Sequence, residues 1–253
     1  MEVLRSLKNP KVQLWRALKD RKARKASGLF LAEGRKMCEE ALASSFPIEA
    51  VLIREGTSFD AGEHPCYVLS ETVFDALCDT KTPQGVIAVV GYQSRKPSGH
   101  RLIALDGVQD PGNVGTIMRT ADAAGFDGVL LSEACADPFS PKALRATMGS
   151  VFRMPVQVVG ALADSLRSYR DRGYAVLCSQ LDGEPFYQRR AVGEQFIIVI
   201  GSEGNGVTHE VAEVSTHHLR LPMRGGAESL NAAVAAGIMM YDLTREMGKD
   251  GSR

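Results

Sequence analysis

Residues 102–125, LIALDGVQDPGNVGTIMRTADAAG, join an apolar run to a helical pattern through a polar loop. The run LIALD is typical of a buried β-strand. The apolar residues after the loop recur at helical spacing, at Val114, Ile117, Met118, Ala121 and Ala124. Asn113 suits the N-cap position of this helix, and Arg119 falls on the side opposite the apolar residues. The stretch therefore predicts a strand, a polar loop and a helix in succession.

Five further apolar runs follow, and helical patterns lie between several of them. They occupy residues 128–132, 156–160, 174–178, 196–201 and 218–222. Most of these runs are unbroken, which is typical of strands buried on both faces. The sequence therefore predicts an α/β fold with a mainly parallel sheet and helices on both faces. Ligands of such sheets bind beyond the carboxyl ends of the strands, so we expect the functional residues in the loops that follow them.

Two of these loops are rich in glycine and polar residues. The segment GSEGNG (201–206) contains Glu203, and its glycines fit either a tight turn or a close approach of the backbone to a ligand. The segment LPMRGGAESLN (221–231) precedes an alanine-rich helical pattern, for which Ser229 suits the N-cap position. The chain has neither the Gly-x-Gly-x-x-Gly pattern of dinucleotide sites nor the Gly-Lys-Ser/Thr ending of a P-loop. These absences argue against an NAD-dependent oxidoreductase and against a Walker-type phosphoryl transferase.

The first 94 residues read as a smaller α/β unit. Helices are predicted at 9–25, 35–44 and 71–77, among apolar runs at 29–32, 50–53, 66–69 and 86–90. The segment YQSRKPSGH (92–100) combines glycine, proline, serine and charge without apolar periodicity, as linkers do. We therefore predict an accessory domain over residues 1–94, a linker over 95–101 and a second domain over 102–253.

Charge is distributed unevenly along the chain. The whole chain has 30 Lys and Arg against 30 Asp and Glu, yet residues 5–25 contain nine basic residues and one acid, Asp20. This segment therefore has a net charge of +8, and the remainder −8. Both a solvated helix face and a surface for nucleic-acid phosphates fit such a cluster.

The five cysteines are scattered and never form a Cys-x-x-Cys pair. This spacing favours reduced thiols in a cytosol over a disulfide framework or a zinc site. The chain starts without a signal-peptide pattern, and no window approaches the roughly 18 consecutive apolar residues of a membrane span. We expect a soluble cytoplasmic protein that uses no metal and no membrane.

The three polar loops, in this order, resemble the three motifs of the SpoU (TrmH) family of RNA ribose 2′-O-methyltransferases, within the SPOUT superfamily. NVGTIMRTADAAG matches the first motif, GSEGNG the second and LPMRGGAESLN the third. SPKALRATMGSVFRMPV (140–156) is similar to the connection between the first two motifs. Residues 9–34 are similar to the family's accessory substrate domain, a small α/β unit related to a ribosomal-protein fold.

The resemblance implies that the cofactor is S-adenosylmethionine and that the methyl acceptor is a ribose 2′-hydroxyl, in ribosomal RNA or, next, in transfer RNA. It assigns catalysis to Asn113, Arg119, Glu203, Ser229 and Asn231. It places the cofactor against Ile200, Gly201, Leu221, Met223, Ser229 and Leu230. Because an arginine is normally always protonated, we expect Arg119 to orient and activate the hydroxyl and the adjacent phosphate rather than to act as a base.

The resemblance also implies a deep trefoil knot near the C-terminus and a homodimer with the site at its interface. It favours RNA binding by the basic cluster, through Lys19, Arg21, Lys22, Arg24 and Lys25. Two alternatives stay open: an inactive RNA-binding dimer of the same fold, and another SPOUT chemistry such as methylation of a base nitrogen. The complete catalytic set argues against the first, and the Asn-x-Gly-x-x-x-Arg motif argues against the second.

Overall fold

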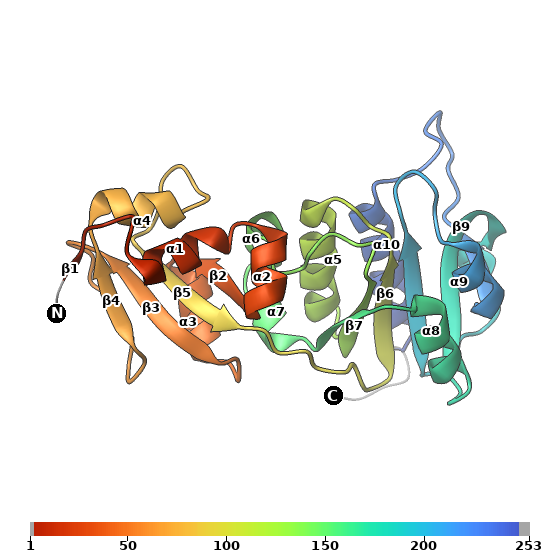
Figure 1. The fold of residues 1–253 in the computed structure, drawn as a ribbon. Helices are drawn as coiled ribbons and strands as arrows, with labels where there is room; N and C mark the ends of the chain where they lie inside the picture. Colours follow the sequence, from red (N-terminus) through yellow and green to blue (C-terminus); the bar gives the residue numbers. More distant parts are fainter. Residues whose placement is uncertain (1–2, 248–253) are drawn as a thin grey trace. The chain divides into compact units, whose positions relative to one another are not determined.

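The computed structural model describes residues 3–247, which form two compact units (Figure 1). Unit 1 comprises Met1–Gln93 and Phe139–Arg153, and unit 2 comprises Ser94–Pro138 and Met154–Arg253. Residues 1–2 and 248–253, at the ends of the two predicted domains, lie outside the described residues. The observed division departs from the predicted one in two places: Phe139–Arg153 is predicted in the second domain but packs with unit 1, and the predicted linker 95–101 lies within unit 2.

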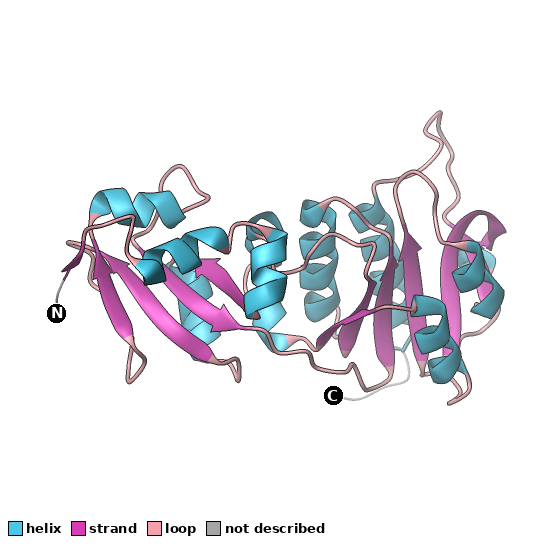
Figure 2. Ribbon diagram, viewed as in Figure 1, coloured by secondary structure: helices cyan, strands magenta, loops and turns pink. Residues whose placement is uncertain are grey.

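Unit 1 is built on a mixed β-sheet with the strand order β1-β4-β3-β5-β2 (Figure 2). Strands β1, β4 and β3 run parallel, whereas β5 runs antiparallel to both β3 and β2. The strands are β1 (Val3–Leu4), β2 (Leu29–Glu33), β3 (Ile48–Arg54), β4 (Cys66–Leu69) and β5 (Val86–Gly91). The helices are α1 (Pro10–Ala17), α2 (Arg21–Ser27), α3 (Arg35–Leu42), α4 (Glu71–Leu77), α6 (Pro141–Thr147) and α7 (Ser150–Arg153).

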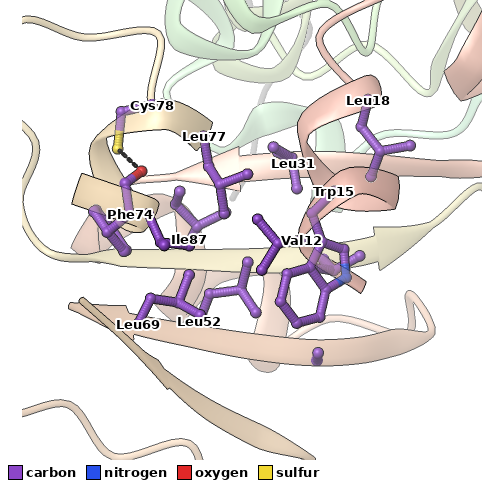
Figure 3. Packing of buried hydrophobic residues seen from close by; sticks show 13 residues of the cluster. Val12, Trp15, Leu18, Leu31, Leu52, Leu69, Phe74, Leu77, Cys78 and Ile87 are labelled. Atoms are coloured by element: carbon purple, nitrogen blue, oxygen red, sulfur yellow. Dashed lines mark hydrogen bonds between the residues drawn. The ribbon is translucent and has the colours of Figure 1, made fainter. Parts of the chain in front are cut away.

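Helices α1 and α4 bury their apolar sides against this sheet (Figure 3). Val12 and Trp15, three residues apart on α1, join Phe74 of α4 in one cluster with Leu52 and Ile87 of the strands. Full burial of a side chain of this size contributes about 1.5–3 kcal/mol to stability, so this cluster fixes α1 on the sheet.

The basic helix predicted over 9–25 is two helices in the structure. Helix α1 ends at Ala17, and the side chain of Asp20 caps α2 by accepting from the backbone N–H groups of Lys22 at 2.7 Å and Ala23 at 3.4 Å. An aspartate at this position satisfies amides that have no partner within the helix, which favours a new start there over one continuous helix.

The segment Phe139–Arg153 joins unit 1 through aromatic packing. The ring of Phe139 lies 4.8 Å from that of Phe30 and 4.6 Å from that of Tyr92, and Phe152 lies 5.3 Å from Phe46. Two ion pairs add to this contact, Arg145 with Asp79 and Arg153 with Glu40. Burial of the aromatic rings explains why the segment leaves the domain predicted from its place in the sequence.

Unit 2 contains a sheet in which every strand pair is parallel, in the order β11-β9-β10-β6-β7-β8. The strands are β6 (Arg101–Asp106), β7 (Gly128–Ser132), β8 (Val156–Val159), β9 (Ala175–Pro185), β10 (Phe196–Gly201) and β11 (His217–Arg220). The predicted parallel sheet is confirmed, and each of its six predicted strands coincides with an observed strand within the usual uncertainty at the ends, except that β9 extends further.

Helices cover both faces of this sheet (Figures 1 and 2). On one face lie α8 (Leu162–Arg170) and α9 (His209–Val214), whose Leu166 and Val211 pack against Leu102 and Val199 of the strands. On the other lie α5 (Pro111–Ala123) and α10 (Ala232–Met247), which pack against each other. A short 3-10 helix, η1 (Phe186–Gln188), follows β9.

The strand order reverses between β6 and β10. From β6 the chain proceeds outward to β7 and β8, then returns on the other side of β6 through β9 and β10. Loops that leave two neighbouring strands at such a point diverge and open a crevice, which is where parallel α/β sheets bind ligands.

Candidate active site

Helix α5 begins one turn earlier than predicted. Its N-cap is Asp110, whose carboxylate accepts from the backbone N–H of Asn113 at 2.9 Å, so the predicted N-cap role of Asn113 is wrong. Both residues have suitable side chains, but Pro111 fits the first helical position and fixes the start. Asn113 therefore lies in the first turn, and its own amide is available for other contacts.

The amide of Asn113 links the first loop to the other two. Its Nδ2 donates to Oε1 of Glu203 at 2.7 Å, and its Oδ1 accepts from Nδ2 of Asn231 at 3.0 Å. Asn231 in turn accepts from the backbone N–H groups of Ala233 at 2.9 Å and Val234 at 3.3 Å. These contacts make Asn231 the cap of α10, in place of the predicted Ser229. The polar chain Asn231–Asn113–Glu203 fixes the orientation of both amides, because each amide oxygen accepts and each nitrogen donates.

The loop that presents Glu203 is folded back on itself. Ser202 and Gly206 exchange two backbone hydrogen bonds, of 2.9 and 3.0 Å, and Gly206 has a φ of +67°. A Cβ at Gly201 would lie 2.0 Å from the carbonyl carbon of Gly206 and 2.2 Å from the nitrogen of Val207. Gly201 is therefore required by the returning backbone of its own loop, which is a more specific reason than the predicted approach to a ligand.

A pocket of about 330 Å³ opens beside this loop. All six residues predicted to contact the cofactor line it: Ile200, Gly201, Leu221, Met223, Ser229 and Leu230. Glu203 lines it as well, so the polar chain reaches the pocket. Volume, apolar side chains and a few polar groups together are typical of a pocket for a small organic ligand.

One wall of the pocket was not predicted. Residues 179–183 bulge out of β9, because His218 of β11 pairs with Cys178 while the next residue, Leu219, pairs with Glu184. Ser179, Gln180, Leu181 and Asp182 line the pocket from this bulge. The sequence contained one signal, since this segment follows the predicted strand 174–178 and the carboxyl ends of parallel strands meet at one edge of the sheet.

Arg119 stands apart from the polar chain. It lies on the exposed side of α5, opposite the buried residues Val114, Ile117 and Met118. Within residues 3–247 it has neither a hydrogen-bond nor an ion-pair partner, and it is not among the residues that line the pocket. Of the five predicted catalytic residues, the structure brings together Asn113, Glu203 and Asn231, places Ser229 in the pocket wall, and leaves Arg119 exposed to solvent.

The five predicted RNA-binding residues of unit 1 differ in their surroundings. Arg24 is only 3% exposed, and its guanidinium donates to the carbonyls of Leu18 and Lys19 at 2.8 Å each. The ammonium of Lys19 donates to the carbonyl of Cys78 at 2.6 Å. Arg24 therefore holds the end of α1 against α2, a structural role that removes it from the expected phosphate contacts. The others, Arg21, Lys22 and Lys25, are exposed.

Other chemistry is not indicated in the described part of the chain. No group of three His, Cys, Asp or Glu side chains there has the arrangement of a metal site. The cysteines within residues 3–247 are all free, and burial raises the pKa of the Cys38 and Cys78 thiols to about 12. None of the helices over these residues is long and apolar enough to cross a membrane.

Comparison with known proteins places this chain in a family. Residues 100–241 match the SpoU rRNA Methylase family, and residues 9–88 match the MRM3-like substrate binding domain. The 23S rRNA (guanosine(2553)-2′-O)-methyltransferase RlmP of Bacillus subtilis is 39% identical over 251 residues, which cover 96% of this chain and 99% of that protein.

Two solved structures agree with these matches. An AdoMet-bound rRNA methyltransferase from Sinorhizobium meliloti superposes with a TM-score of 0.87 at 32% identity, covering 97% of this chain and 98% of that one. The SpoU methyltransferase AviRb from Streptomyces viridochromogenes has the same fold, with a TM-score of 0.87 at 24% identity over 97% of this chain and 100% of that one. The predicted α/β fold, enzyme class and cofactor are thereby confirmed, while the knot stays a prediction. The chain belongs to the SpoU family of S-adenosylmethionine-dependent rRNA methyltransferases.

Proposed function

We propose that this protein methylates a ribose 2′-hydroxyl of 23S ribosomal RNA, with the reacting groups beside the pocket of unit 2. One observation carries the proposal: the polar chain Asn231–Asn113–Glu203 ends at a pocket lined by all six residues that the family motifs assign to the cofactor. The relative from Bacillus subtilis, which aligns over nearly its whole length, is named for this reaction on a guanosine of 23S rRNA. Transfer RNA is the second candidate substrate.

The pocket residues fit S-adenosylmethionine. Leu221, Met223 and Leu230 offer apolar walls for the adenine ring and the methionine chain, and the backbone around Gly201 offers hydrogen-bonding groups. The bulge at 179–183 adds a further wall with the polar side chain of Gln180. When bound, the cofactor supplies an electrophilic methyl group on a sulfonium.

The protein's own residues supply orientation and charge. Arg119 carries a guanidinium that orients the 2′-hydroxyl and neutralises the adjacent phosphate, for which its planar fork of donors is suited. Its exposure on α5 leaves the guanidinium accessible to RNA. Asn113, Glu203 and Asn231 hold the three loops in one geometry, so that acceptor and donor meet in line.

Unit 1 supplies the contact to RNA. The match of residues 9–88 to a substrate-binding domain supports this role for the predicted domain over residues 1–94. The methyltransferase domain predicted over 102–253, which follows the predicted linker at 95–101, belongs to the same proposal, apart from the segment Phe139–Arg153 that packs with unit 1. Arg21, Lys22 and Lys25 form an exposed basic surface on α2, which attracts phosphates without reading sequence. Such a surface raises the affinity for RNA and leaves the selection of one nucleotide to other contacts.

The active form is a homodimer in the cytoplasm. Val234 and Tyr241 lie two turns apart on α10 and are 51% and 54% exposed, so an apolar stripe runs along the outer side of this helix. Burying this stripe against a second copy removes apolar surface from water next to the pocket loops. The C-terminal trefoil knot belongs to the same proposal.

Mass spectrometry of 2′-O-methylated nucleotides tests the proposal. Ribosomal and transfer RNA are compared from cells with and without the gene, and the nucleotide corresponding to guanosine 2553 of 23S rRNA is mapped first. Loss of one ribose methyl in 23S rRNA is the expected result. Loss of a ribose methyl in transfer RNA instead would show that transfer RNA is the substrate. Loss of a base methyl would show that the enzyme methylates a base and not a ribose.

Unchanged ribose methylation, in cells that express the protein, would favour the inactive RNA-binding dimer. Titration calorimetry of the purified protein with S-adenosylmethionine then separates the two cases. Binding of the cofactor without any methylated product leaves catalysis as the missing step, whereas no binding contradicts the assignment of the pocket.

A further inference from the structure

A buried carboxylate lies at the base of the loop that presents Glu203. Asp106 is the last residue of β6, pairs in register with Gly201 at the end of β10, and is only 5% exposed. Its Oδ2 accepts from the backbone N–H of Thr208 at 2.7 Å and from the Thr208 hydroxyl at 2.8 Å. A buried carboxylate is tolerated only with such donors, and hydrogen bonds to a charged acceptor are stronger than neutral ones.

Thr208 connects this carboxylate to the rest of the site. It immediately precedes α9 and stands at its N-cap, yet its side chain makes no capping hydrogen bond, because the hydroxyl is directed to Asp106. Helix α9 is itself fixed, since Val211 and Val214 are buried in the core cluster of unit 2. Residues 202–207 are therefore anchored at both ends, by Gly201 in the sheet and by Thr208 on Asp106.

We propose that Asp106 is a positioning residue for methyl transfer, which holds the loop 202–207 so that Glu203 reaches Asn113 and the loop forms its wall of the cofactor pocket. Asp106 is not among the residues that line this pocket, so it acts through Thr208 and not by contact with a ligand. Without the anchor, the end of the loop at Thr208 is held only through α9. The inference rests on the proposed function, in that the pocket holds S-adenosylmethionine.

The same strand offers a matched control at its other end. Oδ2 of Asp127 accepts from the backbone N–H groups of His100 at 2.7 Å and Arg101 at 2.8 Å, where β6 begins. Both aspartates therefore accept two hydrogen bonds on one oxygen and fix an end of β6. Only Asp106 is joined to the loop of Glu203, so the two residues separate a role in the site from a role in stability.

The test measures cofactor affinity by calorimetry, and kcat and the KM for RNA by methyl transfer to RNA. Asp106→Ala is expected to raise the Kd for S-adenosylmethionine about tenfold and to lower kcat about tenfold or more, with the KM for RNA unchanged, because both hydrogen bonds that hold Thr208 are lost while no group that contacts RNA is changed. Asp106→Asn keeps an acceptor oxygen and is expected to restore most of both values. Thr208→Val lacks the hydroxyl that donates to Asp106, and its Kd and kcat are expected to lie between those of Asp106→Ala and Asp106→Asn.

Asp127→Ala is expected to lower the melting temperature without changing the Kd or kcat at 25 °C. Wild-type Kd and kcat in both Asp106→Ala and Thr208→Val, or equal losses in Asp127→Ala, would overturn the inference. If Asp106→Ala does not fold, Thr208→Val still decides, because this variant lacks the hydroxyl that donates to Asp106, and a wild-type Kd and kcat in it would contradict the anchor. Failure of the wild-type protein to bind S-adenosylmethionine would contradict the proposed function instead.

Discussion

The pocket of unit 2 and the basic surface of unit 1 are built in opposite ways. In unit 2, Asn113, Glu203 and Asn231 are joined to one another by hydrogen bonds of 2.7 and 3.0 Å, so their geometry is set before a ligand arrives. In unit 1, Arg21, Lys22 and Lys25 are exposed on the surface of α2. Chemistry at one methyl group needs atoms fixed within a fraction of an ångström, whereas attraction of a polyanion needs only charge at the surface. Substitutions in the two regions are therefore expected to fail in different measurements.

Arg119→Ala is expected to produce the largest effect. Removal of the guanidinium is expected to lower kcat by about 100- to 1000-fold, as found when one group that stabilises developing charge is removed. The Kd for S-adenosylmethionine is expected to stay within about twofold, because Arg119 does not line the pocket. Single-turnover methyl transfer and calorimetry measure the two quantities separately.

Arg119→Lys provides the control for charge. It keeps the positive charge but loses the planar fork, so its rate is expected to stay close to that of Arg119→Ala. A rate close to wild type in Arg119→Lys would reduce the role of Arg119 to charge alone. Equal loss of rate and cofactor affinity in Arg119→Ala would make Arg119 structural.

Gly201→Ala is expected to weaken cofactor binding about tenfold or more, which is a loss of at least about 1.4 kcal/mol, because it displaces the loop that forms one wall of the pocket. The added Cβ would meet backbone atoms of Gly206 and Val207 at 2.0–2.3 Å, so the loop must move. Gly204→Ala is the matched control in the same loop, because a Cβ there meets no atom within 4 Å. Calorimetric titration with S-adenosylmethionine compares both variants with wild type, and equal affinities in all three would contradict the assigned pocket wall.

The fixed site was also the part that sequence predicted best, although not in its details. Unbroken apolar runs located the parallel strands, and the loops after them contained the residues that line the pocket. The two N-caps were wrong because Asp110 and Asn113, and likewise Ser229 and Asn231, are competing caps within one turn of each other. The local sequence pattern does not show which residue of such a pair is the N-cap, since either side chain can accept a hydrogen bond from the backbone N–H groups of the first turn.

Long-range packing explains the remaining differences. The bulge at 179–183 is an extra segment in β9 that is defined by its pairing with β11, and this pairing joins residues about 40 positions apart in the sequence. The segment Phe139–Arg153 joins unit 1 because the ring of Phe139 packs against those of Phe30 and Tyr92, which are distant in the sequence. The roles of the residues were predicted from the resemblance to a family. The burial of Arg24, which distinguishes it from the exposed basic residues near it, is visible only in the structure.

Replacing Arg21, Lys22 and Lys25 together by alanine is expected to leave cofactor affinity unchanged and to weaken RNA binding. Each phosphate that is no longer neutralised by a basic side chain is expected to reduce the slope of log K against log salt by about 0.7–0.9, so three such phosphates change it by about 2 to 3. Filter binding or fluorescence anisotropy at several salt concentrations measures this slope. An unchanged slope would return this surface to the interpretation as a solvated helix face.

Arg24→Met is expected to have the smallest effect on RNA and a clear effect on stability. The carbonyls of Leu18 and Lys19 are left without their charged donor, so the free energy of unfolding is expected to fall by about 1–3 kcal/mol. Lys22→Met, on the exposed side of the same helix, is the matched control and is expected to unfold like wild type while it binds RNA more weakly. If Arg24 holds α1 against α2 and Lys22 contacts phosphate, Arg24→Met is the less stable variant in urea unfolding, and Lys22→Met is the weaker binder in RNA titration. If one variant is both the less stable and the weaker RNA binder, the two side chains do not have separate roles. The contrast between buried and exposed residues of this basic segment would then be wrong.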